Sequence, residues 1–286
     1  MKNLVVVRCG KYTCHHRMMH PDSQYDVWEL PYQPIQPHAL TTFSNIVTPG
    51  AKFNSIYRLF SEKNDWLDYD YIWIPDDDIS ISHEGVNFLF QEASSDRAVL
   101  SQPSLDEQSY FTHPITLNHP FLRSRSTNFV EVMAPLFSRQ ALIDCLWSFA
   151  INRSGWGLEY LWERILNSTH KASTGKNLTI YDSVKVCHTR PVGGQSRGTG
   201  QISPYDELAS LLAEWNLTIS SYNLALNPHQ ENRHTSVERG SSLFIDLLAS
   251  SCSHIVRQRS LFYPDNKSND ELKVAIKRYY LENIKP

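Results

Sequence analysis

Three consecutive aspartates, Asp76, Asp77 and Asp78, come directly after the β-rich run of residues 69–74. Like charges this close must stay solvated or be neutralised by a cation. In an extended chain, residues two apart point the same way, so Asp76 and Asp78 can converge on one ion. Oxygen ligands suit Mg²⁺ or Mn²⁺, which readily share their shell with a diphosphate. The triplet predicts a divalent metal site, with Asp77 as a further candidate ligand; the alternative is a solvated acidic turn that caps the next helix.

A histidine and two arginines further along the chain could complete such a site. His188 ends a second predicted strand, residues 183–187, where its imidazole could join the same metal shell. Arg190 and Arg197 lie in the glycine-rich stretch that follows, and arginine matches phosphate oxygens in a bidentate way. These residues predict a mobile loop that closes over a phosphate-bearing donor. A structural histidine and a plain solvated loop are the alternatives.

The segment Gly155–Glu159 supplies a carboxylate and a flat ring. Its two glycines allow the backbone to approach a ligand closely, and Trp156 offers a face on which a sugar can stack. Glu159, at the start of the helix predicted next, could accept the proton of a sugar hydroxyl as that hydroxyl attacks. The alternative is a first-turn glutamate that the helix dipole favours.

The elements that must position these residues alternate between strand and helix. Strands are predicted near residues 4–8, 26–30, 69–74, 98–101, 127–137 and 183–187, and helices near residues 52–63, 85–92, 138–149 and 158–166. Residues 102–126 are expected to be irregular, and residues 204–215, 239–258 and 269–283 have helical periodicity. The alternation predicts an α/β fold, a Rossmann-like mixed sheet flanked by helices, in which ligands lie beyond the carboxyl ends of strands.

Composition excludes several classes of function. A net charge of −3 leaves no basic excess for a phosphate backbone, so nucleic acid is not an expected partner. We find neither a transmembrane stretch nor a signal peptide, and five scattered cysteines without a paired spacing favour a reducing cytoplasm. The group Cys14, His15, His16 and His20 could bind zinc but lacks the paired spacing of structural sites.

Five segments, in this order along the chain, resemble a large plant and bacterial family that carries a domain of unknown function, number 707. They are Tyr69–Ile79, Ser101–Asp106, Phe129–Ser138, Gly155–Glu159 and Asp182–His188. The resemblance spans roughly residues 50–195, and the family is itself similar to glycosyltransferases of the GT-A type. It implies a GT-A-like catalytic domain, which we place over residues 1–202. The resemblance does not cover the C-terminal helices, and it is their helical periodicity that predicts a C-terminal helical extension over residues 203–286 packed on this domain.

The resemblance also implies roles for particular residues. In GT-A enzymes an Asp-x-Asp motif binds the metal and the diphosphate, which falls here on Asp76 and Asp78, and a later histidine, here His188, completes the metal shell. Inverting members use the acid after Gly-Trp-Gly as the base, which corresponds to Glu159. This chain departs from that pattern because only one acid follows Gly-Trp-Gly, which leaves Glu131 as a rival base.

The expected function is that of a cytoplasmic, metal-dependent glycosyltransferase. It would move a sugar from a nucleotide diphosphate sugar to a carbohydrate or other hydroxyl acceptor with inversion, in surface polysaccharide synthesis, using Mn²⁺ or Mg²⁺. The expected donor- and acceptor-binding residues are Arg8, Trp156, Gly157, Arg190 and Arg197.

Two other functions use the same features. A metal-dependent nucleotidyltransferase or phosphohydrolase could use the same acidic cluster, and a non-catalytic carbohydrate-binding or assembly protein could have kept the fold. The predicted C-terminal helices could dimerise, dock a partner or touch a membrane surface, so a homo-oligomer is among the expected partners.

Overall fold

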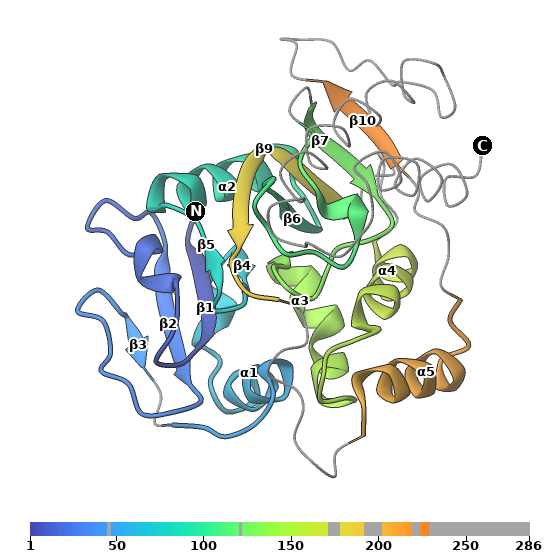
Figure 1. Cartoon of the computed structure of the whole chain (residues 1–286), viewed down its shortest axis with the longest axis horizontal. Coiled ribbons are helices and arrows are strands. Elements are labelled where there is room, and N and C mark those ends of the chain that lie inside the picture. The colour runs from blue at the N-terminus through green and yellow to red at the C-terminus, as the bar shows by residue number, and fades with distance from the viewer. Residues whose placement is uncertain (45–46, 120–121, 171–177, 192–201, 219–223, 229–286) are drawn as a thin grey trace, which may run out of the picture.

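The computed structural model describes residues 1–44, 47–119, 122–170, 178–191, 202–218 and 224–228. Within these residues, ten strands form a mixed sheet with helices on both faces (Figure 1). The strands are β1 (Asn3–Cys9), β2 (Asp26–Pro31), β3 (Phe43–Ser44), β4 (Tyr71–Trp73), β5 (Ile79–Ser80), β6 (Leu100–Leu105), β7 (Leu122–Thr127), β8 (Leu136–Ser138), β9 (Leu178–His188) and β10 (Leu224–Pro228). The α-helices are α1 (Lys52–Glu62), α2 (His83–Asp96), α3 (Arg139–Cys145), α4 (Leu158–Thr169) and α5 (Pro204–Glu214). Short 3₁₀ helices are η1 (His15–Met18), η2 (Asp65–Asp68), η3 (Pro114–Thr116) and η4 (Leu146–Ala150).

The strand directions bring several loops to one edge of the sheet. The order is β10-β7-β9-β6-β8-β4-β1-β2-β3, and β5 pairs with the end of β9. β3, β2, β1 and β4 are parallel neighbours, β8 is antiparallel to β4 and to β6, and β6 is parallel to β9. The strands β1, β2, β4, β6 and β9 therefore end at the same edge. Ligands of open α/β sheets bind beyond such carboxyl ends.

Alternating side chains of β1 contribute to two cores. Val5 and Val7 lie in a cluster with residues of α2, and Leu4 and Val6 lie in a second cluster with residues of α1, α3 and α4. Because successive side chains of a strand point to opposite faces, one strand serves both layers. A strand buried on both faces reads as a continuous apolar run, which is the pattern that predicted a strand over residues 4–8.

Two predicted segments differ from the structure. Residues 102–126, expected to be irregular, contain most of β6 and nearly all of β7, because the polar side chains of β6 find partners inside the protein: Gln102 accepts from the backbone of Glu131, and Ser104 donates to the carbonyl of Val184. The strand predicted over residues 127–137 is a loop over residues 128–135 followed by the short β8. Glu131 therefore lies on a loop and not on a strand.

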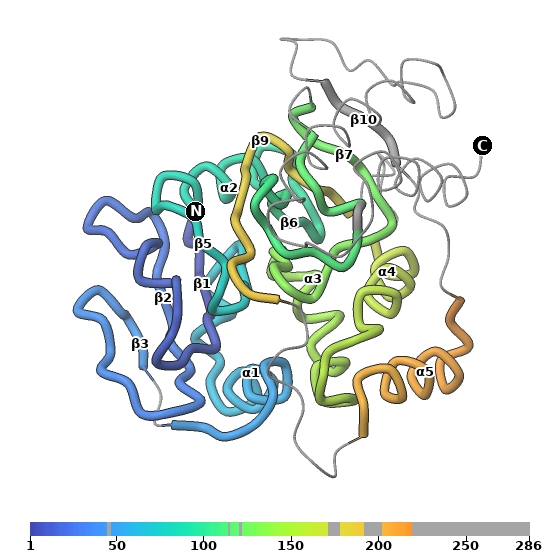
Figure 2. The backbone as a smooth tube through the Cα atoms, in the orientation of Figure 1, coloured from blue at the N-terminus to red at the C-terminus, as the bar shows by residue number. Residues whose placement is uncertain are grey.

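The described part of the predicted C-terminal extension holds a helix and a strand. α5 packs beside the turn before α4, where Glu207 accepts hydrogen bonds from the amides of Arg153 at 3.3 Å and Ser154 at 2.7 Å. Figure 2 shows α5 on the side of the molecule away from β2 and β3. β10 pairs antiparallel with β7 at the end of the sheet, so the extension is not helical throughout. Residues 239–258 and 269–283, predicted as helices, lie outside the described residues.

No helix among the described residues is long and apolar enough to cross a membrane.

Candidate active site

The acidic triplet forms a turn at the carboxyl end of β4. The amide of Ile79 donates to the carbonyl of Asp76 at 3.2 Å, which closes the turn. Asp77 and Asp78 are buried, whereas the side chain of Asp76 is 37% exposed. Side chains two residues apart share a direction only in an extended chain. Because the triplet forms a turn, this rule does not direct Asp76 and Asp78 toward one ion. The contacts of each carboxylate fix its position instead.

Asp76 is held by Lys52, the first residue of α1. The Nζ atom of Lys52 lies 2.7 Å from Oδ1 of Asp76. The same ammonium group donates to the carbonyls of Val132 at 2.9 Å and Met133 at 3.2 Å, and the amide of Asp76 donates to the carbonyl of Met133 at 2.8 Å. Lys52 thus ties the acidic turn to the loop of residues 128–135. It was missed from the sequence because a lysine at a helix start carries no signal of its own.

Asp77 and Asp78 share Arg190. Its guanidinium pairs with the carboxylate of Asp77, and its Nε atom lies 2.9 Å from Oδ2 of Asp78. The hydroxyl of Tyr32, another residue the sequence did not single out, donates to Oδ2 of Asp77 at 2.9 Å. Burial raises the pKa of Asp77. Burial also acts to raise the pKa of Asp78, but the hydrogen bonds and charges of His188 and Arg190 outweigh it, so that pKa is lowered.

β9 brings His188 to the acidic turn. His188 pairs with Ile79 in the β5–β9 ladder, and the amide of Thr189 donates to the carbonyl of Asp78 at 3.0 Å. The Nδ1 atom of His188 lies 2.8 Å from the carbonyl oxygen of Tyr110, and since a carbonyl only accepts, Nδ1 carries a proton. The other ring nitrogen, Nε2, faces Oδ2 of Asp78 at 3.3 Å. Burial works to lower the pKa of His188, but Asp78 outweighs it and the pKa is raised.

Glu131 is a buried carboxyl group beside this turn. It is 6% exposed, and its Oε2 atom has no hydrogen-bond partner among the residues that the structure describes. Burial raises its pKa to about 8, and the nearby charges of Glu159 and Asp76 act in the same direction, against His188 and Lys52. A carboxyl group in this setting keeps its proton near neutral pH.

Glu159 is buried in the first turn of α4. The amide of Gly157 donates to its Oε2 atom at 3.1 Å. Burial raises the pKa of Glu159 to about 7, while backbone hydrogen bonds oppose the shift. Gly157 has a φ of +95°, and a Cβ there would lie 2.6 Å from Leu211 of α5. This position therefore needs glycine both for its left-handed conformation and for the approach of α5.

Three of the predicted ligand-binding residues have other partners or cannot be placed. The buried guanidinium of Arg8 donates to the carbonyls of Leu30 at 3.0 Å, Gly50 at 2.8 Å and Thr48, so it fastens the loop that leads into α1. Trp156 packs edge-on against Tyr205 of α5, with 5.0 Å between ring centroids. Arg197 lies outside the described residues.

Solved structures share this fold, although no family model and no curated protein matches the chain. One is residues 1–349 of TarS from S. aureus in complex with UDP-GlcNAc, with a TM-score of 0.50, 10% sequence identity, and coverage of 99% of this chain and 92% of that one. Another is GalNAc-T7 with UDP, GalNAc and Mn²⁺, with a TM-score of 0.51, 10% identity, and coverage of 99% of this chain and 54% of that one. This chain thus spans about half the length of the GalNAc-T7 structure.

The chain has the GT-A fold. The fold class predicted from the sequence, a GT-A-like mixed sheet flanked by helices, is confirmed by these matches. Identities of 10% establish the fold alone, so the resemblance to the family of unknown function stays a prediction.

The GT-A sheet edge offers a donor set that suits a hard divalent cation. With Nδ1 protonated, Nε2 of His188 and the carboxylate of Asp78 are both acceptors, so a proton or a metal ion must lie between them. A carbonyl that orients the imidazole, as Tyr110 does here, is the usual arrangement behind a metal-ligating histidine. The carboxylate oxygens suit Mn²⁺ or Mg²⁺, and the imidazole would add one softer nitrogen donor to them. The ligand atoms of Asp76, Asp78 and His188 do not all lie within 4.8 Å of one another, and Oδ1 of Asp76 is paired with Lys52. Asp76 could therefore join the other two only after its side chain moves.

Proposed function

We propose that this protein is a metal-dependent glycosyltransferase that moves a sugar from a nucleoside diphosphate donor to a hydroxyl acceptor. The observation that carries the proposal is the acidic turn with His188, placed at the carboxyl edge of a GT-A sheet beside two buried glutamates of raised pKa. TarS with UDP-GlcNAc and GalNAc-T7 with UDP and GalNAc support a uridine diphosphate sugar as the donor class.

In this proposal the acidic turn and its cations bind the diphosphate. Asp78 and His188, joined by Asp76, hold a Mn²⁺ or Mg²⁺ ion, which when bound neutralises charge on the leaving diphosphate. The GalNAc-T7 structure with Mn²⁺ supports manganese as that ion. Arg190 and Lys52 lie against the aspartates and bring two positive side chains to the same edge. A guanidinium can donate two parallel hydrogen bonds to phosphate oxygens, so Arg190 is the residue we assign to the donor.

Glu159 is the base that we assign to the acceptor. A general base works best when its pKa lies near the working pH, and the pKa of Glu159 is raised to about 7. Glu131, with a pKa of about 8, is mostly protonated at neutral pH and is less suited to accept a proton. The acceptor oxygen bonds to the anomeric carbon, the bond to the diphosphate breaks, and Glu159 takes the hydroxyl proton. One displacement of this kind inverts the anomeric centre.

A thermal melting series with nucleoside diphosphates, with and without Mn²⁺, tests the proposal without a known acceptor. A ligand that binds only the folded state adds about 2.7 kcal/mol of stability at a hundredfold excess over its Kd. We expect UDP to raise the melting temperature only when Mn²⁺ is present. The Asp78→Asn variant should lose this shift, and Asp65→Asn, a change of an exposed aspartate in η2, should keep it.

The products separate this reaction from the other candidates. Incubation with a UDP-sugar should release UDP, whereas a nucleotidyltransferase or phosphohydrolase would release pyrophosphate or inorganic phosphate. If no nucleotide shifts the melting temperature in the presence of Mn²⁺, the proposal is wrong and a binding or assembly role takes its place.

A further inference from the structure

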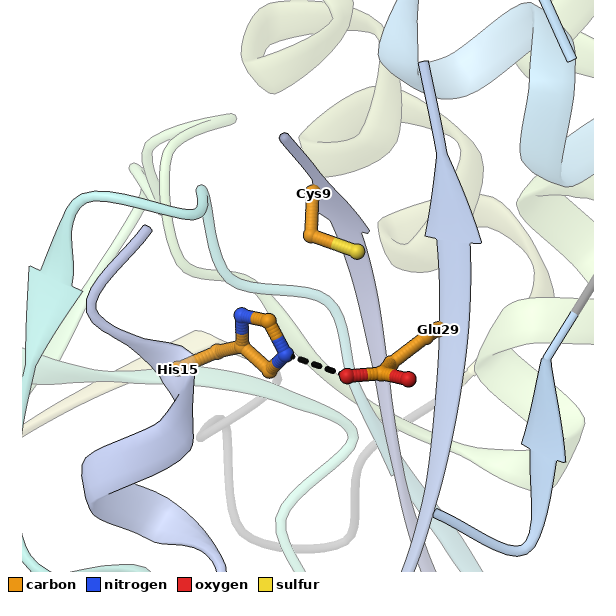
Figure 3. Close-up of side chains that lie close together, drawn as sticks. All are labelled: Cys9, His15 and Glu29. Atoms are coloured by element: carbon orange, nitrogen blue, oxygen red, sulfur yellow. Dashed lines mark hydrogen bonds and ion pairs between the residues drawn. The ribbon is translucent and has the colours of Figure 1, made fainter. Parts of the chain in front are cut away.

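We propose that Cys9, His15 and Glu29 form a second metal site, which binds a thiophilic divalent cation of the zinc class. One ligand atom from each residue lies within 4.8 Å of the other two. All three residues are buried, at 0%, 4% and 1% exposure. Figure 3 shows the thiol, the imidazole and the carboxylate converging on one point between β1, β2 and η1. This proposal does not rest on the glycosyltransferase function.

The sheet places the two strand residues on one face. Cys9 ends β1, and Glu29 lies on the adjacent parallel strand β2, opposite Val7. Because side chains alternate along a strand, Cys9 points to the same face as Val7, and so does Glu29 beside it. His15 opens η1 and reaches over this face from the loop that follows β1. Three ligands thus come from three separate pieces of backbone.

The hydrogen bonds of His15 determine which of its ring nitrogens is free to bind a cation. The hydroxyl of Thr13 donates to the carbonyl of Asp77 at 3.0 Å, so the 2.5 Å contact between Thr13 Oγ1 and Nδ1 of His15 needs the proton on Nδ1. The Nε2 atom then faces Oε1 of Glu29 at 2.6 Å. Two acceptors this close require either a second proton on the ring or a positive ion. In metal sites, the ring nitrogen of histidine that does not bind the ion usually makes a hydrogen bond that orients the ring, as Nδ1 of His15 does here.

The chemistry of the ligands selects the ion. A thiolate and a carboxylate together balance the charge of a divalent cation, so the loaded site is neutral, as a buried site must be. Sulfur and imidazole donors favour Zn²⁺ over Mg²⁺ or Mn²⁺, which prefer oxygen. The second carboxylate oxygen of Glu29 accepts from the amide of His38 at 3.3 Å, so a water molecule would be the fourth ligand of a tetrahedral shell. Zinc bonds of about 2.0–2.3 Å need donor atoms that are more than 3 Å apart, so His15 and Glu29 must separate slightly when the ion enters.

The segments that carry Cys9 and His15 also contact the acidic turn and its partner Tyr32. The loop that carries His15 donates to the carbonyl of Asp77 from the amide of Cys14 at 2.7 Å and from the hydroxyl of Thr13. The carbonyl of Cys9 accepts from the amide of Tyr32 at 3.0 Å, and the hydroxyl of Tyr32 reaches the carboxylate of Asp77. An ion at this site would therefore fix the backbone and one side-chain partner of Asp77.

Cobalt spectroscopy of the full chain tests the proposal. Co²⁺ bound to a thiolate gives a near-ultraviolet charge-transfer absorption that oxygen and nitrogen ligands do not give. We expect this absorption in the wild-type protein at one Co²⁺ per chain, and its loss in Cys9→Ala. Cys145→Ala is the matched control, since Cys145 is equally buried but lies in the other core. Cys14→Ala removes the thiol of the residue whose amide donates to Asp77, and this variant should keep the absorption.

Competition in the wild-type protein covers the case in which Cys9→Ala does not fold. Zn²⁺ should abolish the cobalt absorption and raise the melting temperature, and Mn²⁺ should leave the absorption unchanged. Asp78→Asn alters the proposed Mn²⁺ or Mg²⁺ site at the acidic turn. This variant should show the same loss of cobalt absorption and the same rise in melting temperature with Zn²⁺ as the wild type. The proposal is overturned if wild-type protein shows no thiolate–cobalt absorption, or if Cys9→Ala folds and retains it.

Discussion

The acidic turn and the two buried glutamates lie at the same edge of the sheet but differ in how their charge is compensated. Asp78 has His188 and Arg190 as partners, and its pKa is lowered. Glu159 and Glu131 are buried without an ion-pair partner among the described residues, and burial raises their pKa values to about 7 and about 8. A carboxylate with two cationic partners, such as Asp78, stays charged and can serve as a ligand, whereas the two glutamates, which have none, can exchange protons near neutral pH. Environment, and not residue type, thus separates the two roles.

The largest effect is expected from removing a charge at the acidic turn. Asp78→Asn keeps the shape of the side chain but removes the negative charge that we assign to the metal. We expect release of UDP from a UDP-sugar in the presence of Mn²⁺ to fall by at least about 10²–10³, the usual effect of losing one electrostatic contact to a developing charge. Asp65→Asn is the control. Wild-type turnover in Asp78→Asn would remove the acidic turn from the reaction.

The next largest effect is expected on kcat, and it should differ between the two glutamates. Glu159→Gln should lower kcat by about 10²–10⁴, the contribution typical of a general base, while Mn²⁺-dependent stabilisation by UDP stays as in the wild type. Glu131→Gln should reduce kcat less, because Glu131 is mostly protonated at neutral pH. Steady-state kinetics of both variants decide the assignment. A larger loss in Glu131→Gln would exchange the two roles.

The raised pKa values also predict how stability depends on pH. The folded state holds the proton of Glu159 more tightly than the unfolded state, so its contribution to stability is complete below pH 4.5 and is lost as pH rises through about 7. Glu159→Gln should therefore raise the free energy of unfolding at pH 8 by up to roughly 3 kcal/mol, and should change it little at pH 4.5. Denaturant unfolding at both pH values measures this.

Glu131→Gln should follow the same pattern, and Glu62→Gln, at an exposed position of α1, should be neutral at both pH values. Equal effects at the two pH values would show that charge is not the cause.

The smallest effect is expected at Lys52, which links the acidic turn to the loop that carries Glu131. Lys52→Met keeps most of the side chain but removes the ion pair with Asp76 and the hydrogen bonds to the loop of residues 128–135. We expect the free energy of unfolding to fall by roughly 1–3 kcal/mol, because the carbonyl of Val132 and the carboxylate of Asp76 lose the donor that Lys52 supplies. Lys185→Met, at an exposed position of β9, is the control. An unchanged stability would show that Lys52 does not hold the loop in place.

Local patterns in the sequence predicted much of the fold and part of the site. The apolar run of β1, the helical periodicity of α1 and the Ser138 cap of α3 are signals that a short window contains. The meeting of Asp78 with His188 followed from their places at strand ends, since Asp78 lies in the turn after β4, His188 ends β9, and parallel strands bring their carboxyl ends to one edge.

The failures come from contacts between distant parts of the chain. The polar strand β6 looked like a loop because the partners of Gln102 and Ser104 come from elsewhere in the chain. The pairing of Lys52 with Asp76 depends on how α1 packs, and a single lysine in the sequence does not predict such an ion pair. Likewise, the sequence groups His15 with its neighbours Cys14, His16 and His20, whereas the register of two strands brings Cys9 and Glu29 to it.

The pairing of β10 with β7 protects one edge of the sheet. β10 covers the edge of β7 that faces away from β9, where alternate residues would otherwise leave their amides and carbonyls without a partner strand. Uncovered strand edges readily pair with other copies and lead to aggregation. A shortened form that ends before residue 224 would keep every residue of the two candidate sites, yet it would expose this edge. Such a fragment should associate with itself at concentrations where the full chain does not.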